Sequence, residues 1–197
     1  MTSDETCRPL LATVLLLSLA ACQQGGGGAP VAEFEMIDLP APAMFNELAR
    51  GLGRPHLLEL PPRSINERHD LRMVDTDELS VLDAIIALDS SFAYDRRPGV
   101  LILHPVGQEK EASPFSTVVS SFQVEGSVAQ ALQDLIVVGL PKETALTAAP
   151  AGQSRPVRVD MQNATVRDVL AEIAAQAHLS LSVEPGIIRM EIVPPVD

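Results

Sequence analysis

The sequence predicts an α+β protein made of two tandem copies of one small module, on two observations. First, a residue in the first half and the residue 88 positions later usually share the same character. Second, runs typical of strands, with alternating apolar residues, and runs typical of helices, with apolar residues three and four apart, follow one another in the same order in each half. Such a constant offset indicates internal duplication. The matching pairs include Phe34 and Phe122, Met44 and Leu132, Leu48 and Ile136, Leu71 and Val159, Met73 and Met161, and Ile85 and Ile173.

The first module is expected over residues 31–106. Its first helix should begin near Pro42, because proline suits the first turn of a helix, and Gly51 lies where that helix should end. A second helix should run from about Asp77 to Asp89, with leucine and isoleucine on its buried face. The expected strands are a short one ending before Pro40, then His56–Leu60, His69–Val74, Ser91–Asp95 and Val100–His104, the last two joined by a turn at Arg97-Pro98-Gly99.

Residues 107–114 form a polar linker, and the second module is expected over residues 115–197. Ser127 is placed to cap its first helix, while Asn163 or Thr165 caps the second, with Asp168 completing an approximate capping box. The expected strands are Val118–Val124, Arg155–Met161, Leu179–Val183 and Ile187–Val193. The stretch 144–149 replaces the apolar His56–Leu60 with a weaker strand, so a looser edge or a plain loop is expected there.

Two stretches carry a resemblance to a known family. The stretch from His69 to Ile85 combines a strand, a polar turn and a leucine-rich helix, and the stretch from Val157 to Leu170 repeats this plan. Each half resembles the secretin and TonB short N-terminal domain, a module found ahead of secretin pores and on signalling TonB-dependent receptors. The resemblance implies that the two helices of each module lie between a two-stranded and a three-stranded sheet.

The N-terminal residues 1–21 resemble the signal peptide of a bacterial lipoprotein. The apolar run from Leu10 to Ala21 is short of the 20 or so residues that a membrane-spanning helix needs. It ends in Leu19-Ala20-Ala21-Cys22, which resembles a lipobox. The resemblance implies that Cys22 carries diacylglycerol and further acyl chains such as palmitate. The alternative is an ordinary secretory signal with an incidental cysteine.

The residue after Cys22 bears on location. An aspartate at that place tends to retain lipoproteins of Gram-negative bacteria at the inner membrane, whereas this chain has Gln23. By that resemblance the protein is expected at the outer membrane, anchored by lipid and facing the periplasm. Residues 22–30 then form a Gly-rich tether that holds the first module near the lipid surface.

Charge and residue types exclude several functions. The formal net charge of −12 would be repelled by phosphates, so nucleic acid is not an expected partner. His56, His69, His104 and His178 do not lie at the spacing of metal ligands, and solvated or strand-end histidines are the simpler reading. Motifs for a nucleophile, a phosphate loop or paired catalytic carboxylates are not found. We therefore expect no enzyme activity, no metal, no cofactor and no small-molecule substrate.

The expected function is protein–protein interaction. Small sheets of the implied type leave edge strands with unpaired backbone groups, which partners can extend. The sequence predicts an assembly accessory of a secretin-type secretion or pilus system, or of TonB-linked signalling, that binds an envelope protein or further copies of itself. The alternative is a structural envelope lipoprotein without a dedicated secretion partner.

Overall fold

The computed structural model describes residues 28–61, 67–106, 113–148 and 150–196, and it is mixed α+β, as the sequence predicts. The elements of the first half are β1 (Pro30–Leu39), α1 (Ala41–Gly51), β2 (His56–Glu59), β3 (His69–Asp77), α2 (Glu78–Leu88), β4 (Phe92–Arg97) and β5 (Val100–Pro105). Those of the second half are η1 (Pro114–Ser116), β6 (Val118–Ser127), α3 (Val128–Gly139), β7 (Ala145–Ala148), α4 (Pro150–Gln153), β8 (Pro156–Thr165), α5 (Val166–Ala177), β9 (Leu179–Glu184) and β10 (Ile187–Ile192). Within the weak segment 144–149, Ala145–Ala148 thus form a strand, β7.

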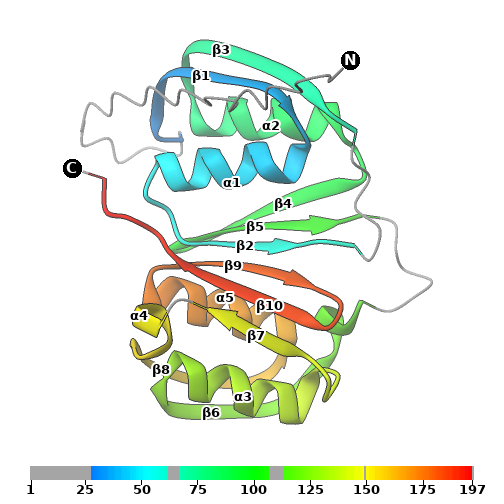
Figure 1. The fold of residues 1–197 in the computed structure, drawn as a ribbon, viewed down its shortest axis with the longest axis vertical. Coiled ribbons are helices and arrows are strands. Elements are labelled where there is room, and N and C mark those ends of the chain that lie inside the picture. Colours follow the sequence, from blue (N-terminus) through cyan, green and yellow to red (C-terminus); the bar gives the residue numbers. More distant parts are fainter. Residues whose placement is uncertain (1–27, 62–66, 107–112, 149, 197) are drawn as a thin grey trace, which may run out of the picture.

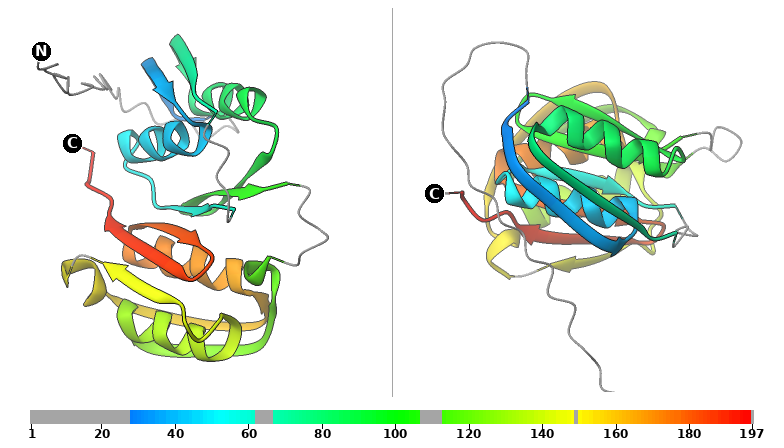
Figure 2. Two further views of the ribbon diagram at one scale, coloured as in Figure 1. Left: turned by 45° about the vertical axis from the view of Figure 1, so that its right-hand side comes forward. Right: turned by 90° about the horizontal axis from the view of Figure 1, so that it is seen from above.

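The elements stack in layers along the longest axis of the molecule (Figure 1). The β1–β3 pair lies outermost at one end, followed by helices α1 and α2, a central sheet, helices α5 and α3, and the β6–β8 pair at the other end. The left view of Figure 2 also shows that the helices of the two halves lie on opposite sides of the central sheet. Each half therefore covers a different face of one shared layer.

The central layer is a single six-stranded sheet in the order β4-β5-β2-β9-β10-β7. The expectation of a separate three-stranded sheet in each half is therefore wrong, because β2 and β9 pair in parallel and join the two sets of strands. Their register runs from His56 opposite Ser180 to Glu59 opposite Val183. Sequence periodicity describes each strand but carries no signal for which distant edge it meets.

The strands that reach this junction from the first half are apolar on both faces. Leu58, Leu101 and Leu103 pack in the core of the first half. Leu57, Val100 and Ile102 point the other way and belong to the core of the second half. Continuous apolar runs are typical of strands that are covered on both sides. The second half thus completes its core with side chains from the first.

Three of the α-helices begin with a residue whose side chain caps the helix. The Asp77 carboxylate accepts from the backbone N–H of Leu79 and Ser80 at 2.9 and 3.0 Å, and the Ser127 hydroxyl accepts from the N–H of Gln130 at 3.2 Å. Of the two candidates for the last helix, Thr165 is the cap and forms a capping box with Asp168.

A bulge in β1 changes the offset between the halves. Phe34 pairs with Met73 and Phe122 with Met161, so these strands keep the offset of 88. The caps Pro40 and Ser127, however, lie only 87 apart, because the register of β1 shifts after Met36. One consequence is a correction to the repeat: the buried counterpart of Leu48 is Leu135, and Ile136 is only partly buried.

Candidate functional site

The expected lipidation site lies outside the described residues. Cys22, the signal segment 1–21 and most of the tether 22–30 precede Gly28, the first residue that the structure describes. Lipidation of Cys22 therefore stays a prediction. In the part of the chain that is described, no helix is long and apolar enough to cross a membrane.

The four histidines lie apart in the fold. His56 is buried in β2, His69 begins β3, His104 lies in β5 with its Nε2 3.5 Å from a carboxylate oxygen of Asp95, and His178 takes the left-handed conformation that ends α5. Across the described ranges, no group of three or more His, Cys, Asp or Glu side chains could hold a metal ion.

One of these histidines forms a polar cluster at the β2–β9 junction that the sequence did not indicate. The Nδ1 of His56 lies 2.9 Å from the Arg54 carbonyl, and its Nε2 lies 2.8 Å from the Ser180 hydroxyl and 2.9 Å from the Asn46 side-chain oxygen. Because a carbonyl only accepts, Nδ1 carries the proton, and Nε2 accepts from Ser180. The Asn46 amide then bonds to Nε2 only with its NH2 group, rather than its oxygen, turned towards the ring. The cluster therefore joins α1 and β2 of the first half to β9 of the second.

The environment of this cluster suits a structural role. Burial lowers the pKa of His56 to about 4, although the hydrogen bond to Arg54 acts in the opposite direction. A general base is most effective when its pKa lies near the working pH, so His56 would take a proton from Ser180 poorly. Ser180 is also only 5% exposed. The one sequence signal for this cluster was a histidine at the start of an otherwise apolar strand.

Two ion pairs hold the second half against the first on the face of the sheet that α5 covers, opposite to the face with His56. Glu59 at the end of β2 is 1% exposed and accepts two hydrogen bonds from Arg167 of α5, one of them 2.9 Å long. This contact raises the pKa of Arg167. The Nη1 of Arg97 lies 2.5 Å from the Oδ1 of Asp168, at the start of α5. Burial raises the pKa of Asp168, but hydrogen bonds from Thr165 and the charge of Arg97 outweigh it, so the net shift is downward.

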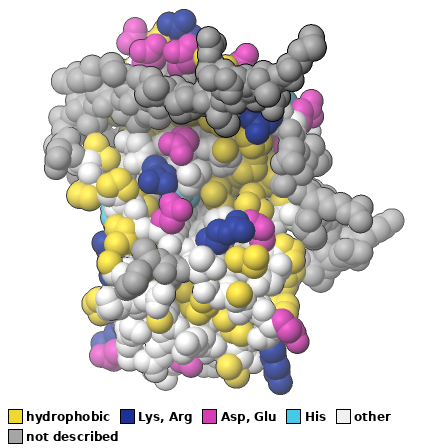
Figure 3. All heavy atoms as spheres, in the orientation of Figure 1, with side chains coloured by type: hydrophobic (Ala, Val, Ile, Leu, Met, Phe, Trp, Pro, Cys, Tyr) yellow, Lys and Arg dark blue, Asp and Glu magenta, His cyan; other side chains and the backbone are white. Residues whose placement is uncertain are grey.

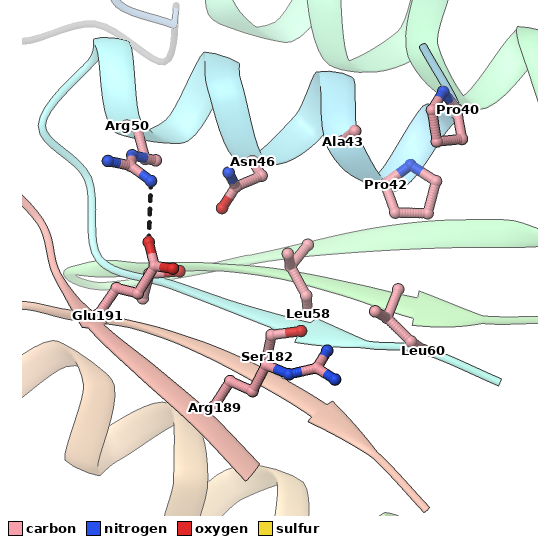
Figure 4. A pocket seen from close by; sticks show the side chains of 11 residues that line it. Pro40, Pro42, Ala43, Asn46, Arg50, Leu58, Leu60, Ser182, Arg189 and Glu191 are labelled. Atoms are coloured by element: carbon pink, nitrogen blue, oxygen red, sulfur yellow. Dashed lines mark hydrogen bonds and ion pairs between the residues drawn. The ribbon is translucent and has the colours of Figure 1, made fainter. Parts of the chain in front are cut away.

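A cavity of about 360 Å³ opens beside the junction, between α1 and the strands of the second half. Figure 4 shows Asn46 and Arg50 descending from α1 towards Leu58, Ser182 and Glu191 on the sheet. Arg50 and Glu191 form an ion pair of 2.8 Å across it. Both side chains are exposed, and such pairs contribute less than about 1 kcal/mol. On the face drawn in Figure 3, basic side chains lie beside acidic ones and do not gather in one basic patch.

Among the described residues, the six-stranded sheet has one edge strand without a second partner at each end, β4 and β7. The two edges differ in the side chains around them. Strand β4 carries the exposed charges Asp95 and Arg96, and charged residues are a common protection against strand addition. Near β7 in sequence, the end of α3 exposes Val137, which is 75% accessible. These are the two edges at which a partner strand could extend the central sheet.

The comparisons with known proteins found no matching family model, no similar curated protein and no similar solved structure.

Proposed function

We propose that this protein is a non-catalytic lipoprotein of the outer membrane that binds a protein partner by extending its sheet. In this proposal Cys22 carries the lipid, and the two halves are diverged copies of one module similar to the secretin and TonB short N-terminal domain. The protein then acts as an assembly accessory of a secretin-type secretion or pilus system, or of TonB-linked signalling.

One observation carries the proposal. The two halves are already joined by edge pairing, since β2 of the first half and β9 of the second meet as parallel strands. The same sheet ends in two strands with one free side each, β4 and β7. Backbone groups along such an edge pair readily with a strand from another chain. A sheet that is assembled by edge pairing, and that leaves edges open, supports a binding role.

The experiment is recovery of the tagged full-length protein from its own envelope after mild crosslinking, followed by mass spectrometry. A secretin, a pilus component or a TonB-linked receptor among the crosslinked proteins is the expected result. Recovery with abundant wall-associated proteins alone would favour the structural envelope lipoprotein. A Cys22→Ser variant, which should leave the membrane fraction, is the control for the anchor.

A further inference from the structure

The two halves of the central sheet are related by a regular operation. Strand β4 is antiparallel to β5, and β5 is parallel to β2; likewise β9 is antiparallel to β10, and β10 is parallel to β7. Because β2 and β9 run in parallel, the second set of strands repeats the first with every strand direction reversed. The strands β4, β5 and β2 are brought onto β9, β10 and β7 by a rotation of half a turn about an axis that lies in the sheet perpendicular to the strands, followed by a shift along that axis. It also places the helices of the two halves on opposite faces (Figure 1).

Strand β7 is thereby the counterpart of β2, and its outer edge corresponds to the place where β9 sits on β2. The pairing of β9 with β2 is heterologous, and with a shift along the axis such a contact does not close into a ring. The second half therefore has an edge on β7 like the one that β2 offers to β9, and that edge is open. His56 pairs with Leu101 in the first half, and Leu146 pairs with Ile188 in the second. Leu101 and Ile188 each lie two residues after the turn glycine of their hairpin, so Leu146 is the counterpart of His56.

The backbone of β7 is oriented to accept a strand. The Ala145 N–H points inward and donates to the Gly186 carbonyl at 2.8 Å. Because alternate residues of a strand direct their backbone groups to opposite sides, the N–H and C=O of Leu146 point outward. At the β2–β9 junction the Leu60 N–H donates to the Val183 carbonyl at 2.9 Å in the same sense. A strand added to β7 in this way would run parallel to it.

The side chains that surround the two acceptor edges differ in character. On β2, the polar His56 meets Ser180, and Arg50 of α1 meets Glu191. On β7 the counterpart of His56 is the apolar Leu146. The counterpart of Arg50, ten residues after the helix cap in each case, is Val137. A strand on β7 takes the place of β9. It would therefore meet the apolar Leu146, as Ser180 meets His56, and would lie beside the apolar Val137, as Ser180 and Ser182 line the cavity together with Arg50.

The other edge does not supply that strand. If a second copy added its β4 to β7 as β9 adds to β2, Ala93 would take the place of Ser180, and Asp95 would take that of Ser182. Asp95 is an exposed charge that would lie on the side of α3 and Val137. Its carboxylate lies 3.5 Å from the Nε2 of His104, and burying this charge against the apolar Val137 would be unfavourable. A strand with apolar residues on that side fits the edge, and the β4 strand of a second copy does not.

We infer that β7 is the docking edge, and that its occupant is a parallel strand of another protein with apolar side chains on the face towards α3. This inference rests on the proposed function and specifies its site. The edge of β4, with Asp95 and Arg96 beside it, is not used.

The test uses the purified full-length chain in detergent and a fluorescent synthetic peptide. The peptide alternates threonine and valine and has a lysine at each end; a second peptide has glutamate in place of valine. Fluorescence polarisation should show saturable binding of the first and at least tenfold weaker binding of the second.

The variants separate the backbone from the side chains. Leu146→Pro removes the outward N–H and should weaken peptide binding at least tenfold, whereas Leu146→Ala, which keeps the N–H, should lose far less. Val137→Asp lies on the exposed surface of α3, so it keeps the test decisive even if the proline variant fails to fold, and it should weaken binding at least tenfold. Arg96→Pro at the β4 edge is the matched control and should bind as the unaltered chain does.

Failure of this inference is distinguishable from failure of the proposed function. Absence of peptide binding, or binding that Leu146→Pro and Val137→Asp leave unchanged, overturns the assignment of β7. If the envelope experiment still recovers a secretin, pilus or receptor partner from those variants, the proposed function stands and the edge is wrong. Peptide binding with the expected variant pattern, but without such a partner, retains the edge and overturns the function.

Discussion

The two halves contribute corresponding strands to the central sheet, but these strands have different surroundings. In β2 and β5 of the first half, the apolar residues on both faces are buried, because the two cores lie on either side of them. In β10 of the second half, Ile188 and Met190 are buried while Arg189 and Glu191 between them are exposed. Each half supplies one edge strand and two inner strands of the shared sheet, but β2 and β5 are covered on both faces, whereas β10 is exposed on one face. The difference shows that strands in corresponding positions of the two halves follow what covers their faces.

The largest expected effect comes from a leucine that lies between the two cores. Leu57→Ala should destabilise the fold by roughly 3–5 kcal/mol, because Leu57 is fully buried and its loss leaves a cavity on the shared face. Its counterpart on the free edge is Thr147, which is exposed, so Thr147→Ala should change stability by less than about 0.5 kcal/mol. Chemical denaturation of both variants measures the contrast, and equal effects would contradict the difference between the halves.

A buried and an exposed ion pair between the two halves should also differ in their contribution to stability. Glu59→Ala should cost about 3 kcal/mol, since it leaves the partly buried Arg167 without the carboxylate that accepts its hydrogen bonds. Glu191→Ala removes an exposed ion pair with Arg50 and should cost less than about 1 kcal/mol. Urea unfolding curves at neutral pH give both values. A Glu59 variant as stable as the Glu191 variant would show that this pair does not hold the halves together.

The junction should also respond to pH. Burial lowers the pKa of folded His56 to about 4, whereas the unfolded value is 6.5, so the unfolded chain binds a proton first as pH falls. The stability from this group is full above pH 6.5 and is lost between pH 6.5 and 4, amounting to about 3 kcal/mol in total. Unfolding free energies measured over this range should fall less steeply in His56→Gln than in the unaltered chain. Parallel pH profiles would refute the burial of a neutral histidine.

The smallest expected effect concerns the helix starts. Ser127 caps α3 with a side-chain hydrogen bond, whereas Pro40 at the start of α1 makes none. Ser127→Ala should therefore cost about 1 kcal/mol, measured as a lower melting temperature. Ser120→Ala, at an exposed position of β6, is the control and should leave the melting temperature unchanged.

Much of the local structure could be predicted from the sequence, because local signals determine it. The turn at Pro98-Gly99 separates β4 from β5 as expected, and Ser127 and Thr165 cap the helices that follow them. The apolar runs in β2 and β5 indicated burial, but periodicity could not say that the second covering layer comes from the other half. The cluster of His56 and Ser180 was missed for the same reason, since its members lie 124 residues apart in the chain.

The bulge in β1 was missed for a different physical reason. One extra residue between a strand and a helix leaves the apolar pattern of both intact. A comparison of residue types between the halves therefore keeps the offset of 88 that gives the most matches. Only the backbone reveals the shift, through the left-handed conformation of Asp38 at a φ of 56°. Candidate sites at an edge depend on such one-residue shifts, since a shift by one moves a side chain to the opposite face.

The pairing of β2 with β9 also has a consequence for the order in which the polypeptide can fold. Ribosomes deliver β2 early, but its neighbour in the finished sheet belongs to the last hairpin of the described chain. Until that hairpin is synthesised, β5 can pair with one edge of the apolar strand β2 while its other edge stays open, and such species aggregate readily. Contacts of large sequence separation also form slowly. The nascent protein should thus depend on holding factors for nearly its whole synthesis and gain protection from proteolysis in one late step.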